Sequence, residues 1–278
     1  MIDTKKIRYA FSSNAFRKYS LTDTIKILSD IGYDGIEIMA DTPHAYPPEL
    51  SEMDIADIRD ALSRQEMEIS NINAFMLHAV GDTWHPSWIE KDPALRKIRI
   101  NHTLNCIDLA DKLGAPTISI EPGGPLDGIS TEEGITLFLE GLSVIKERAR
   151  ESGVRVLIEP EPGLLIENSS QFMDLFNELN PNVFGLNFDV GHFFCVGEDP
   201  SILIMDMRDV IGHFHLEDIA ASRIHRHLMP GHGVIDMKSV LNSIQEINYS
   251  GMVTVELYPY ENHPVEAAEQ ALKYLLVL

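Results

Sequence analysis

The sequence predicts a (βα)8 barrel, in which eight parallel strands, each followed by a helix, close into a ring. Short runs of apolar and β-branched residues alternate with longer helical patterns from one end of the chain to the other. We count eight such strand-then-helix units in 278 residues, and one barrel of this kind typically takes about 250 residues. No linker, low-complexity tract or break in composition divides the chain, so we expect one domain over residues 1–278.

The expected strands are short runs rich in Val, Ile and Phe, bounded by Gly, Pro or Asp. An open doubly wound sheet would show the same alternation, but no Gly-x-Gly-x-x-Gly motif follows an early strand. Two smaller α/β domains are the other alternative, and no change in composition supports them. The expected strands cover residues 7–11, 35–39, 68–75, 116–121, 154–159, 183–189, 211–216 and 252–257.

The expected helices are longer segments with capping residues at their ends. Ser20 or Thr22 is a candidate N-cap of the first helix, and Gly32 follows its last turn. Gly114 and Gly153 end two long helices in the same way. The expected helices cover residues 21–31, 48–65, 93–113, 131–152, 170–179, 200–208, 236–247 and 264–277.

Charge and cysteine content exclude several classes of function. The chain has 22 Lys and Arg against 43 Asp and Glu, a net charge of −21. This charge repels nucleic acid and anionic membrane surfaces, so neither is an expected partner. Cys106 and Cys195 are the only cysteines, too few for a disulfide framework or a Cys-rich zinc site. With no apolar run long enough for a membrane span or signal peptide, we expect a cytoplasmic protein.

Ionisable residues collect where the expected strands end, which is where barrels of this kind place their sites. Most of them lie inside apolar runs such as Val-Thr-Val-Glu-Leu, so they are expected to be buried. An unpaired buried charge costs several kcal/mol to desolvate. The strand-end residues are Glu37, Glu121, Glu159, Asp189, His213, His215 and Glu256, and His192 follows in the turn after Asp189.

A divalent metal would explain how several carboxylates can share one barrel mouth, because among the strands that carry these residues only Arg155 brings a cationic side chain. The best ligand set is Glu159, Asp189, His215 and Glu256, from four successive strands. Three carboxylates and one imidazole suit Mn²⁺, Mg²⁺, Co²⁺ or Fe²⁺, and Zn²⁺ is compatible. A hydrogen-bonded polar cluster without an ion is the alternative.

Five motifs in this order resemble the xylose-isomerase-like TIM-barrel superfamily over nearly the whole chain. That group includes sugar isomerases and epimerases, inosose dehydratases and endonuclease-IV-type enzymes. The resemblance implies the same four metal ligands. The motifs are VLIEPEPG, GLNFDVGHFFCVG, HFHLED, PGHGVID and TVEL.

The resemblance also implies roles for individual residues. In the sugar-isomerising members, the glutamates of strands five and eight transfer protons on opposite faces of the substrate, which here are Glu159 and Glu256. The histidine after the strand-six aspartate, here His192, contacts substrate oxygens. The substrate would be a small carbohydrate. Barrels of this kind often form homo-oligomers, and the sequence names no interface.

A histidine-rich loop after the seventh expected strand, RIHRHLMPGHG at residues 223–233, departs from the sugar-isomerase pattern. In the endonuclease-IV-like branch, a similar loop helps to bind a further zinc, and the matching residues here are His192, His225 and His227. Three imidazoles can hold a zinc ion with an open position. Substrate binding by a mobile basic loop is the alternative, with Arg226 as a candidate. His78 and Glu121 lie near the ends of strands three and four, and we expect them to contact substrate or a further metal.

Four functions remain. The first is a metal-dependent isomerase or epimerase of a small sugar, keto-sugar or polyol. The second is a lyase or dehydratase that uses the same proton abstraction on a sugar or inositol derivative. The third is a multi-zinc phosphodiesterase of the endonuclease IV kind, against which the charge of −21 argues. The fourth is a catalytically silent barrel, against which the intact ligand set argues.

Overall fold

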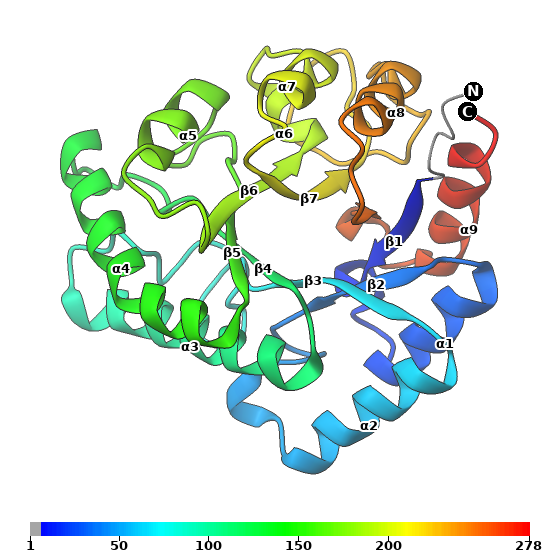
Figure 1. Ribbon diagram of the computed structural model, residues 1–278, viewed down its shortest axis with the longest axis horizontal. Helices are drawn as coiled ribbons and strands as arrows, with labels where there is room; N and C mark the ends of the chain where they lie inside the picture. Colours follow the sequence, from blue (N-terminus) through cyan, green and yellow to red (C-terminus); the bar gives the residue numbers. More distant parts are fainter. Residues whose placement is uncertain (1–6) are drawn as a thin grey trace.

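A computed structural model of the chain describes residues 7–278 and forms a closed barrel of eight parallel strands (Figure 1). Each strand pairs with the next in sequence order, and β8 pairs with β1. The (βα)8 prediction is confirmed. The expectation of one domain over residues 1–278 also covers residues 1–6, which lie outside the described residues. The strands are β1 (Arg8–Ser12), β2 (Gly35–Met39), β3 (Glu68–Asn73), β4 (Thr117–Ile120), β5 (Arg155–Ile158), β6 (Phe184–Asp189), β7 (Ile211–Leu216) and β8 (Met252–Val255).

The helices surround the ring of strands (Figure 1). Within residues 7–278, none of them is long and apolar enough to cross a membrane. The helices are α1 (Leu21–Ile31), α2 (Glu52–Arg64), α3 (Pro93–Leu113), α4 (Thr131–Ser152), α5 (Ser169–Phe176), α6 (Val190–Cys195), α7 (Pro200–Asp206), α8 (Met237–Glu246) and α9 (Pro264–Leu275), with the 3-10 turns η1 (Ser13–Phe16), η2 (Pro47–Glu49) and η3 (Tyr258–Tyr260).

Local capping explains where the helices begin and end. Ser20 accepts a hydrogen bond from the backbone N–H of Asp23 at the start of α1, and Gly32 ends that helix with a φ of 107°. The helix expected from residue 48 begins at Glu52 instead. Two consecutive prolines form η2, and a capping box between Ser51 and Asp54 then starts α2.

The helix α6 is absent from the sequence-based expectations, and it delivers a candidate site residue. The last residue of β6, Asp189, is its N-cap and accepts a hydrogen bond from the backbone N–H of His192 at 2.7 Å. With only six residues, α6 is too short for a periodic pattern to reveal it. It turns His192 back toward the barrel mouth.

Apolar side chains of the strands pack outward against the helices, while the barrel interior is polar. Ile36, Ile72 and Val253 belong to the fully buried apolar layer. Inside, Asn71 donates to Glu37 at 2.8 Å and to Ser119 at 2.9 Å. Buried polar groups need such partners to offset their desolvation. The interior is therefore a hydrogen-bonded network that fixes the side chains at the mouth.

Asp218 holds the long loop between β7 and α8, which carries His225 and His227. Its carboxylate accepts hydrogen bonds from the backbone N–H groups of Gly231, Gly233 and Ile235 at 2.8–3.0 Å. Its side chain is almost fully buried, with 1% of the residue exposed. A carboxylate has enough lone pairs to accept all of these bonds, whereas an amide has one acceptor oxygen.

We predict that Asp218→Asn lowers the free energy of unfolding by about 1–3 kcal/mol, because buried donors lose their acceptor. Urea denaturation measures this change. Asp209→Asn is the matched control, since the Asp209 side chain is 90% exposed, and it should change stability by less than about 0.5 kcal/mol. Equal stability of the two variants would contradict the role of Asp218.

Candidate functional site

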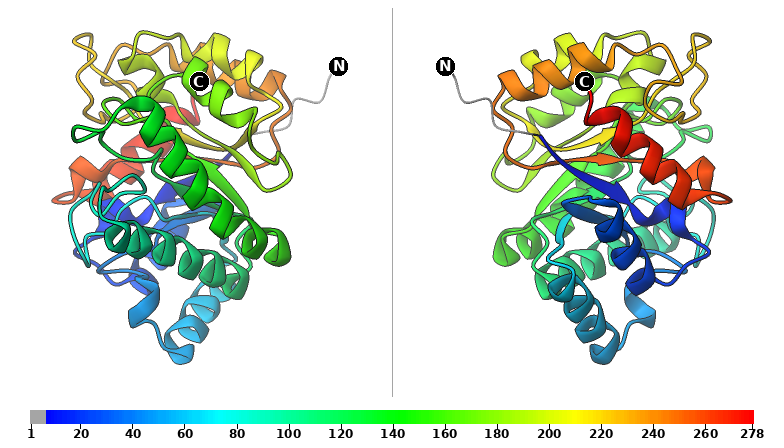
Figure 2. Two further views of the ribbon diagram at one scale, coloured as in Figure 1. Left: turned by 90° about the vertical axis from the view of Figure 1, so that its left-hand side faces the viewer. Right: turned by 90° about the vertical axis from the view of Figure 1, so that its right-hand side faces the viewer.

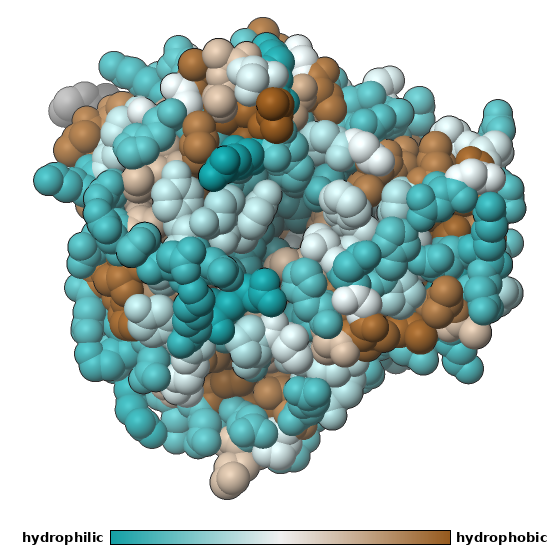
Figure 3. Space-filling view, turned by 180° about the vertical axis from the view of Figure 1, so that it is seen from behind, coloured by the Kyte–Doolittle hydropathy of each residue, from teal (hydrophilic) through white to brown (hydrophobic). Residues whose placement is uncertain are grey.

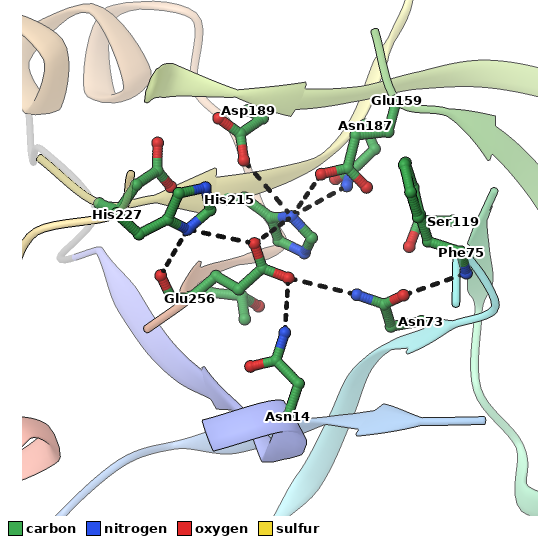
Figure 4. Close-up of polar contacts among 12 residues, drawn as sticks. Asn14, Asn73, Phe75, Ser119, Glu159, Asn187, Asp189, His215, His227 and Glu256 are labelled. Atoms are coloured by element: carbon green, nitrogen blue, oxygen red, sulfur yellow. Dashed lines mark hydrogen bonds and ion pairs between the residues drawn. The ribbon is translucent and has the colours of Figure 1, made fainter. Parts of the chain in front are cut away.

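Four side chains at the ends of β5 to β8 converge at one end of the barrel (Figure 4). Glu159, Asp189, His215 and Glu256 each offer one ligand atom, and these atoms lie within 4.8 Å of one another. All four residues are buried. Asp189 and His215 are direct register partners on β6 and β7. The structure thus brings together the four residues that the strand-end pattern selected.

His215 lies at the centre of this group. Its Nδ1 is 2.8 Å from Oε1 of Glu159, 3.8 Å from Oδ2 of Asp189 and 3.7 Å from Oε2 of Glu256. Its Nε2 lies 2.7 Å from Oε2 of Glu37. Burial alone would lower the pKa of His215, but these carboxylates raise it well above its ordinary value.

Glu37 is a site residue whose role the sequence did not reveal. Burial alone would raise its pKa, but the neighbouring His215 and His213 and a hydrogen bond from Asn71 hold it at about 2. It therefore stays ionised and fixes one nitrogen of His215, so that the other faces the cluster. The available signal was an acid inside the apolar run Gly-Ile-Glu-Ile-Met, but the run does not show which residue it contacts.

Two further polar groups position Glu256. Asn14 donates to its Oε1 at 2.8 Å, and Asn73 donates to the same oxygen at 3.3 Å (Figure 4). Burial and the neighbouring carboxylates raise the pKa of Glu256 well above its ordinary value. Its other oxygen faces His215 and His227.

The donor set fits a divalent cation. Within the described part of the chain, Oε2 of Glu159 and Oδ2 of Asp189 are buried and have no hydrogen-bond partner. Such orphaned oxygens are costly unless something outside the protein satisfies them. Both belong to the four-residue group, and Oδ2 of Asp189 lies 3.8 Å from Nδ1 of His215. A hard or borderline cation among three carboxylates and one imidazole would satisfy them.

A second group of ligand atoms comprises His192, His225 and His227, which also lie within 4.8 Å of one another. His192 Nδ1 bonds the carbonyl of Pro160 at 2.8 Å, and His227 Nδ1 bonds that of Glu256 at 3.0 Å. With Nδ1 donating in both residues, the Nε2 atoms of His192 and His227 are acceptors, and that of His227 lies 3.2 Å from Nε2 of His225. Burial lowers the pKa of His192 and of His225 to about 4, so both are neutral near pH 7.

A cavity of about 800 Å³ opens above these groups. The face seen in Figure 3 is hollowed near its centre and largely hydrophilic around the hollow. His78 lines the cavity, as expected for a substrate contact. Arg226 and Glu121 are not among its described lining residues. Arg226 is exposed on its loop, so the expected substrate contact has no geometric support for either residue.

Glu121 instead lies fully buried behind the barrel mouth, away from the cavity. Its Oε1 is 3.4 Å from Nε of Arg99, and both side chains are fully buried. Arg99 also donates to the carbonyls of Phe75 and Pro86 at 2.6 and 2.7 Å. The pair therefore anchors the loop after β3, which contributes Met76, His78 and Trp84 to the cavity wall.

Loop residues complete the cavity wall. Glu161 is 6% exposed and lines the cavity. Trp84 and Tyr258 line it as well. Trp88 and Phe16 are fully buried in the core instead. The sequence does not show how far each loop folds back over the mouth.

Crowded carboxylates should destabilise the ion-free protein. The pKa of Glu256 lies well above its ordinary 4.5, so its contribution to stability is full below about pH 4.5 and is lost as pH rises through the folded-state value. We predict that Glu256→Gln raises the Tm of chelator-treated protein at pH 8 and that this gain disappears below pH 4.5. Thermal unfolding followed by circular dichroism measures it.

Glu269→Gln is the control for this experiment, because Glu269 is exposed on α9. It should leave the Tm unchanged at both pH values. A Glu256→Gln variant that is less stable than the parent at pH 8 would contradict the crowding argument.

Comparison with solved structures shows similarity over nearly the whole chain. The IOLI protein with a bound zinc atom has a TM-score of 0.80 at 21% identity, covering 98% of this chain and 97% of that one. The 3-keto-D-glucoside 4-epimerase from E. coli has a TM-score of 0.81 at 17% identity, covering 98% and 100%. At these identities the likeness shows the fold.

Comparison with curated proteins finds inosose dehydratases. The one from Lacticaseibacillus casei is 32% identical over 153 residues, 49% of this chain and 51% of that protein. The one from Clostridium tetani is 29% identical over 165 residues, 53% and 55%. The chain thus spans about half the length of these relatives. The family model described as "Xylose isomerase-like TIM barrel" matches residues 25–277, which confirms the resemblance: the chain belongs to the xylose isomerase-like TIM barrel family.

Proposed function

We propose that the protein is a metal-dependent isomerase or epimerase of a small sugar, keto-sugar or polyol. The observation that carries this proposal is the placement of Glu159 and Glu256. They follow β5 and β8, which β6 and β7 separate, and both line the cavity while facing the same nitrogen of His215. Two carboxylates that reach one substrate position from different strands can remove a proton and return it.

Glu159, Asp189, His215 and Glu256 would hold the metal, and the zinc-bound IOLI protein has the same fold. A divalent cation of the Mn²⁺, Mg²⁺, Co²⁺ or Zn²⁺ type would polarise the substrate carbonyl and acidify the adjacent C–H group. Glu159 takes that proton, and the electron pair of the C–H bond shifts toward the carbonyl. Glu256 returns a proton to the opposite face. His192, held through Nδ1 by Pro160, contacts a substrate oxygen through Nε2.

A dehydratase is the second candidate, and the sequence similarity to inosose dehydratases favours it. The first step is the same proton removal, after which a hydroxyl group on the next carbon leaves as water. The site residues keep their roles up to that point. The two reactions therefore differ in the step after proton removal, when either a proton returns to carbon or a hydroxyl group leaves.

We predict one metal ion per chain in protein purified without chelator, measured by elemental mass spectrometry. Asp189→Asn should lose it, because it removes a ligand charge from the cluster. A His192→Ala/His227→Ala double variant should keep it. Two or three zinc ions, falling by one in the double variant, would shift the assignment toward a multi-zinc phosphodiesterase that uses His225 as well. Metal-free protein under all supplementation would contradict the proposal.

We predict that Glu37→Gln weakens metal binding about 10–100-fold, the usual effect of losing the partner that orients a histidine ligand. Competition with a fluorescent chelator measures the Kd. Glu49→Gln, at an exposed position in η2, should bind metal like the parent. Unchanged affinity in Glu37→Gln would show that Glu37 does not orient His215.

The reaction itself is tested with a panel of keto-sugars and inososes in D₂O, analysed by NMR and mass spectrometry. Deuterium incorporation without loss of water indicates isomerisation or epimerisation, and loss of one water indicates dehydration. Glu159→Gln and Glu256→Gln should each reduce turnover by about 10²–10⁴-fold. Glu269→Gln should leave it unchanged. Full activity in either site variant would contradict proton transfer by these residues.

A further inference from the structure

A second large cavity lies at the opposite end of the barrel from the candidate site. It has a volume of about 870 Å³ and is lined by residues at the starts of β1, β3, β4, β5, β7 and β8 and by part of α2. The two side views place the start of β1 and the turn after β8 on opposite sides of the molecule (Figure 2). No residue lines both this cavity and the one above His215.

The lining of this cavity, which we call the basal cavity, is basic. Among the described lining residues, four are arginines and Glu68 is the single acidic one. Glu68 neutralises one of the four, since it pairs with Arg8 at 2.7 Å. Arg59, Arg155 and Arg208 remain. The chain has 22 Lys and Arg and a net charge of −21. The arginines on this concave surface therefore make it locally positive in a protein whose overall potential is negative.

Arg155 is the innermost of these arginines, and the barrel makes room for it. Gly185 on β6 lies beside its guanidinium, and a Cβ there would come within 2.5 Å of Nη2. Gly212 on β7 is equally constrained, because a Cβ there would lie 2.5 Å from Leu157 and 3.4 Å from Nη1 of Arg155. The two glycines let the guanidinium lie across the bases of the neighbouring strands.

The guanidinium of Arg155 lacks hydrogen-bond partners for some of its N–H groups. Nη2 donates to the carbonyl of Phe184 at 3.2 Å, while Nε is buried without a hydrogen-bond partner within residues 7–278. Over the same residues, Arg155 forms no ion pair with a carboxylate. Burial lowers its pKa, which reflects the cost of holding a cation there. An anion from outside the chain would offset that cost.

We propose that the basal cavity binds a small anion carrying a phosphate or carboxylate group, with Arg155 at its base and Arg59 and Arg208 at its rim. Arginine forks suit both groups, because planar N–H pairs match two oxygens at once. Arg59 is exposed on α2. The side chain of Arg208 is 58% exposed, and its contacts are long: 3.9 Å to Asp209 and 3.5 Å to the carbonyl of Met205. Both can therefore turn toward a ligand. Because the anion would join side chains from β5, α2 and the segment before β7, its binding would stabilise the barrel.

The probes are sodium phosphate and sodium citrate, titrated against chelator-treated protein with sodium chloride at matched ionic strength. We expect the Tm to rise with phosphate or citrate concentration and not with chloride. A response to phosphate alone identifies a phosphate ligand, and a response to citrate alone identifies a carboxylate ligand. No rise with either, or an equal rise with chloride, overturns the proposal.

Variants locate the binding site. Arg155→Gln should abolish the response, and Arg59→Ala/Arg208→Ala should raise the Kd about five-fold or more by removing two charge-assisted contacts. The double variant changes exposed residues and keeps the test valid if Arg155→Gln does not fold. Arg64→Ala is the control, since Arg64 is 74% exposed on the same helix and does not line the cavity. His192→Ala should also bind like the parent. Binding that survives in the double variant, or is lost in His192→Ala, overturns the proposal.

Discussion

The contact between Glu37 and His215 is the interaction on which the rest of the site depends. One imidazole nitrogen is held at 2.7 Å by a buried carboxylate from β2, so the other must face the ends of β5, β6 and β8. The three carboxylates gathered there repel one another in a medium that screens charge poorly. A cation at their centre removes this conflict, and the orphaned oxygens of Glu159 and Asp189 mark where it would be bound.

The barrel fold explains why such a cluster survives folding. Each of these residues lies on a strand or directly after one, and outward side chains of the strands, such as Phe188 and Phe214, are fully buried between the sheet and the helices. The polar interior then locks the mouth from below, for instance through His213, which bonds Asn187 at 2.8 Å and Thr254 at 2.7 Å. The stability of the apolar layer therefore offsets the cost of a cluster that is unfavourable without its ion.

The alternation of strand-like and helix-like segments predicted the fold. The ionisable residues at the strand ends predicted the four central residues, because the strands of a barrel end at one place whatever the conformation of the loops. Other side chains are placed by contacts across the barrel or by loop packing, which the strand ends do not determine. Glu121 also ends a strand, yet Arg99 draws it behind the mouth. Glu37 contacts His215 across the barrel interior, a pairing that no local pattern encodes. The short helix α6 and the buried position of Glu161 depend on loop packing, which the sequence of one chain does not specify.

The two ends of the barrel differ in the charge that they present to a ligand. Besides the histidines, four glutamates and a single arginine, Arg17, line the cavity above His215, whereas arginines dominate the basal cavity. Even a bound dication would leave the upper cavity with little net attraction for a phosphate or carboxylate. A neutral polyhydroxylated substrate is not subject to this repulsion, and its hydroxyl groups can bond the carboxylates and imidazoles that line the wall. The charge distribution thus favours uncharged carbohydrates over sugar phosphates at the candidate active site, and it directs small anions to the other end of the same barrel.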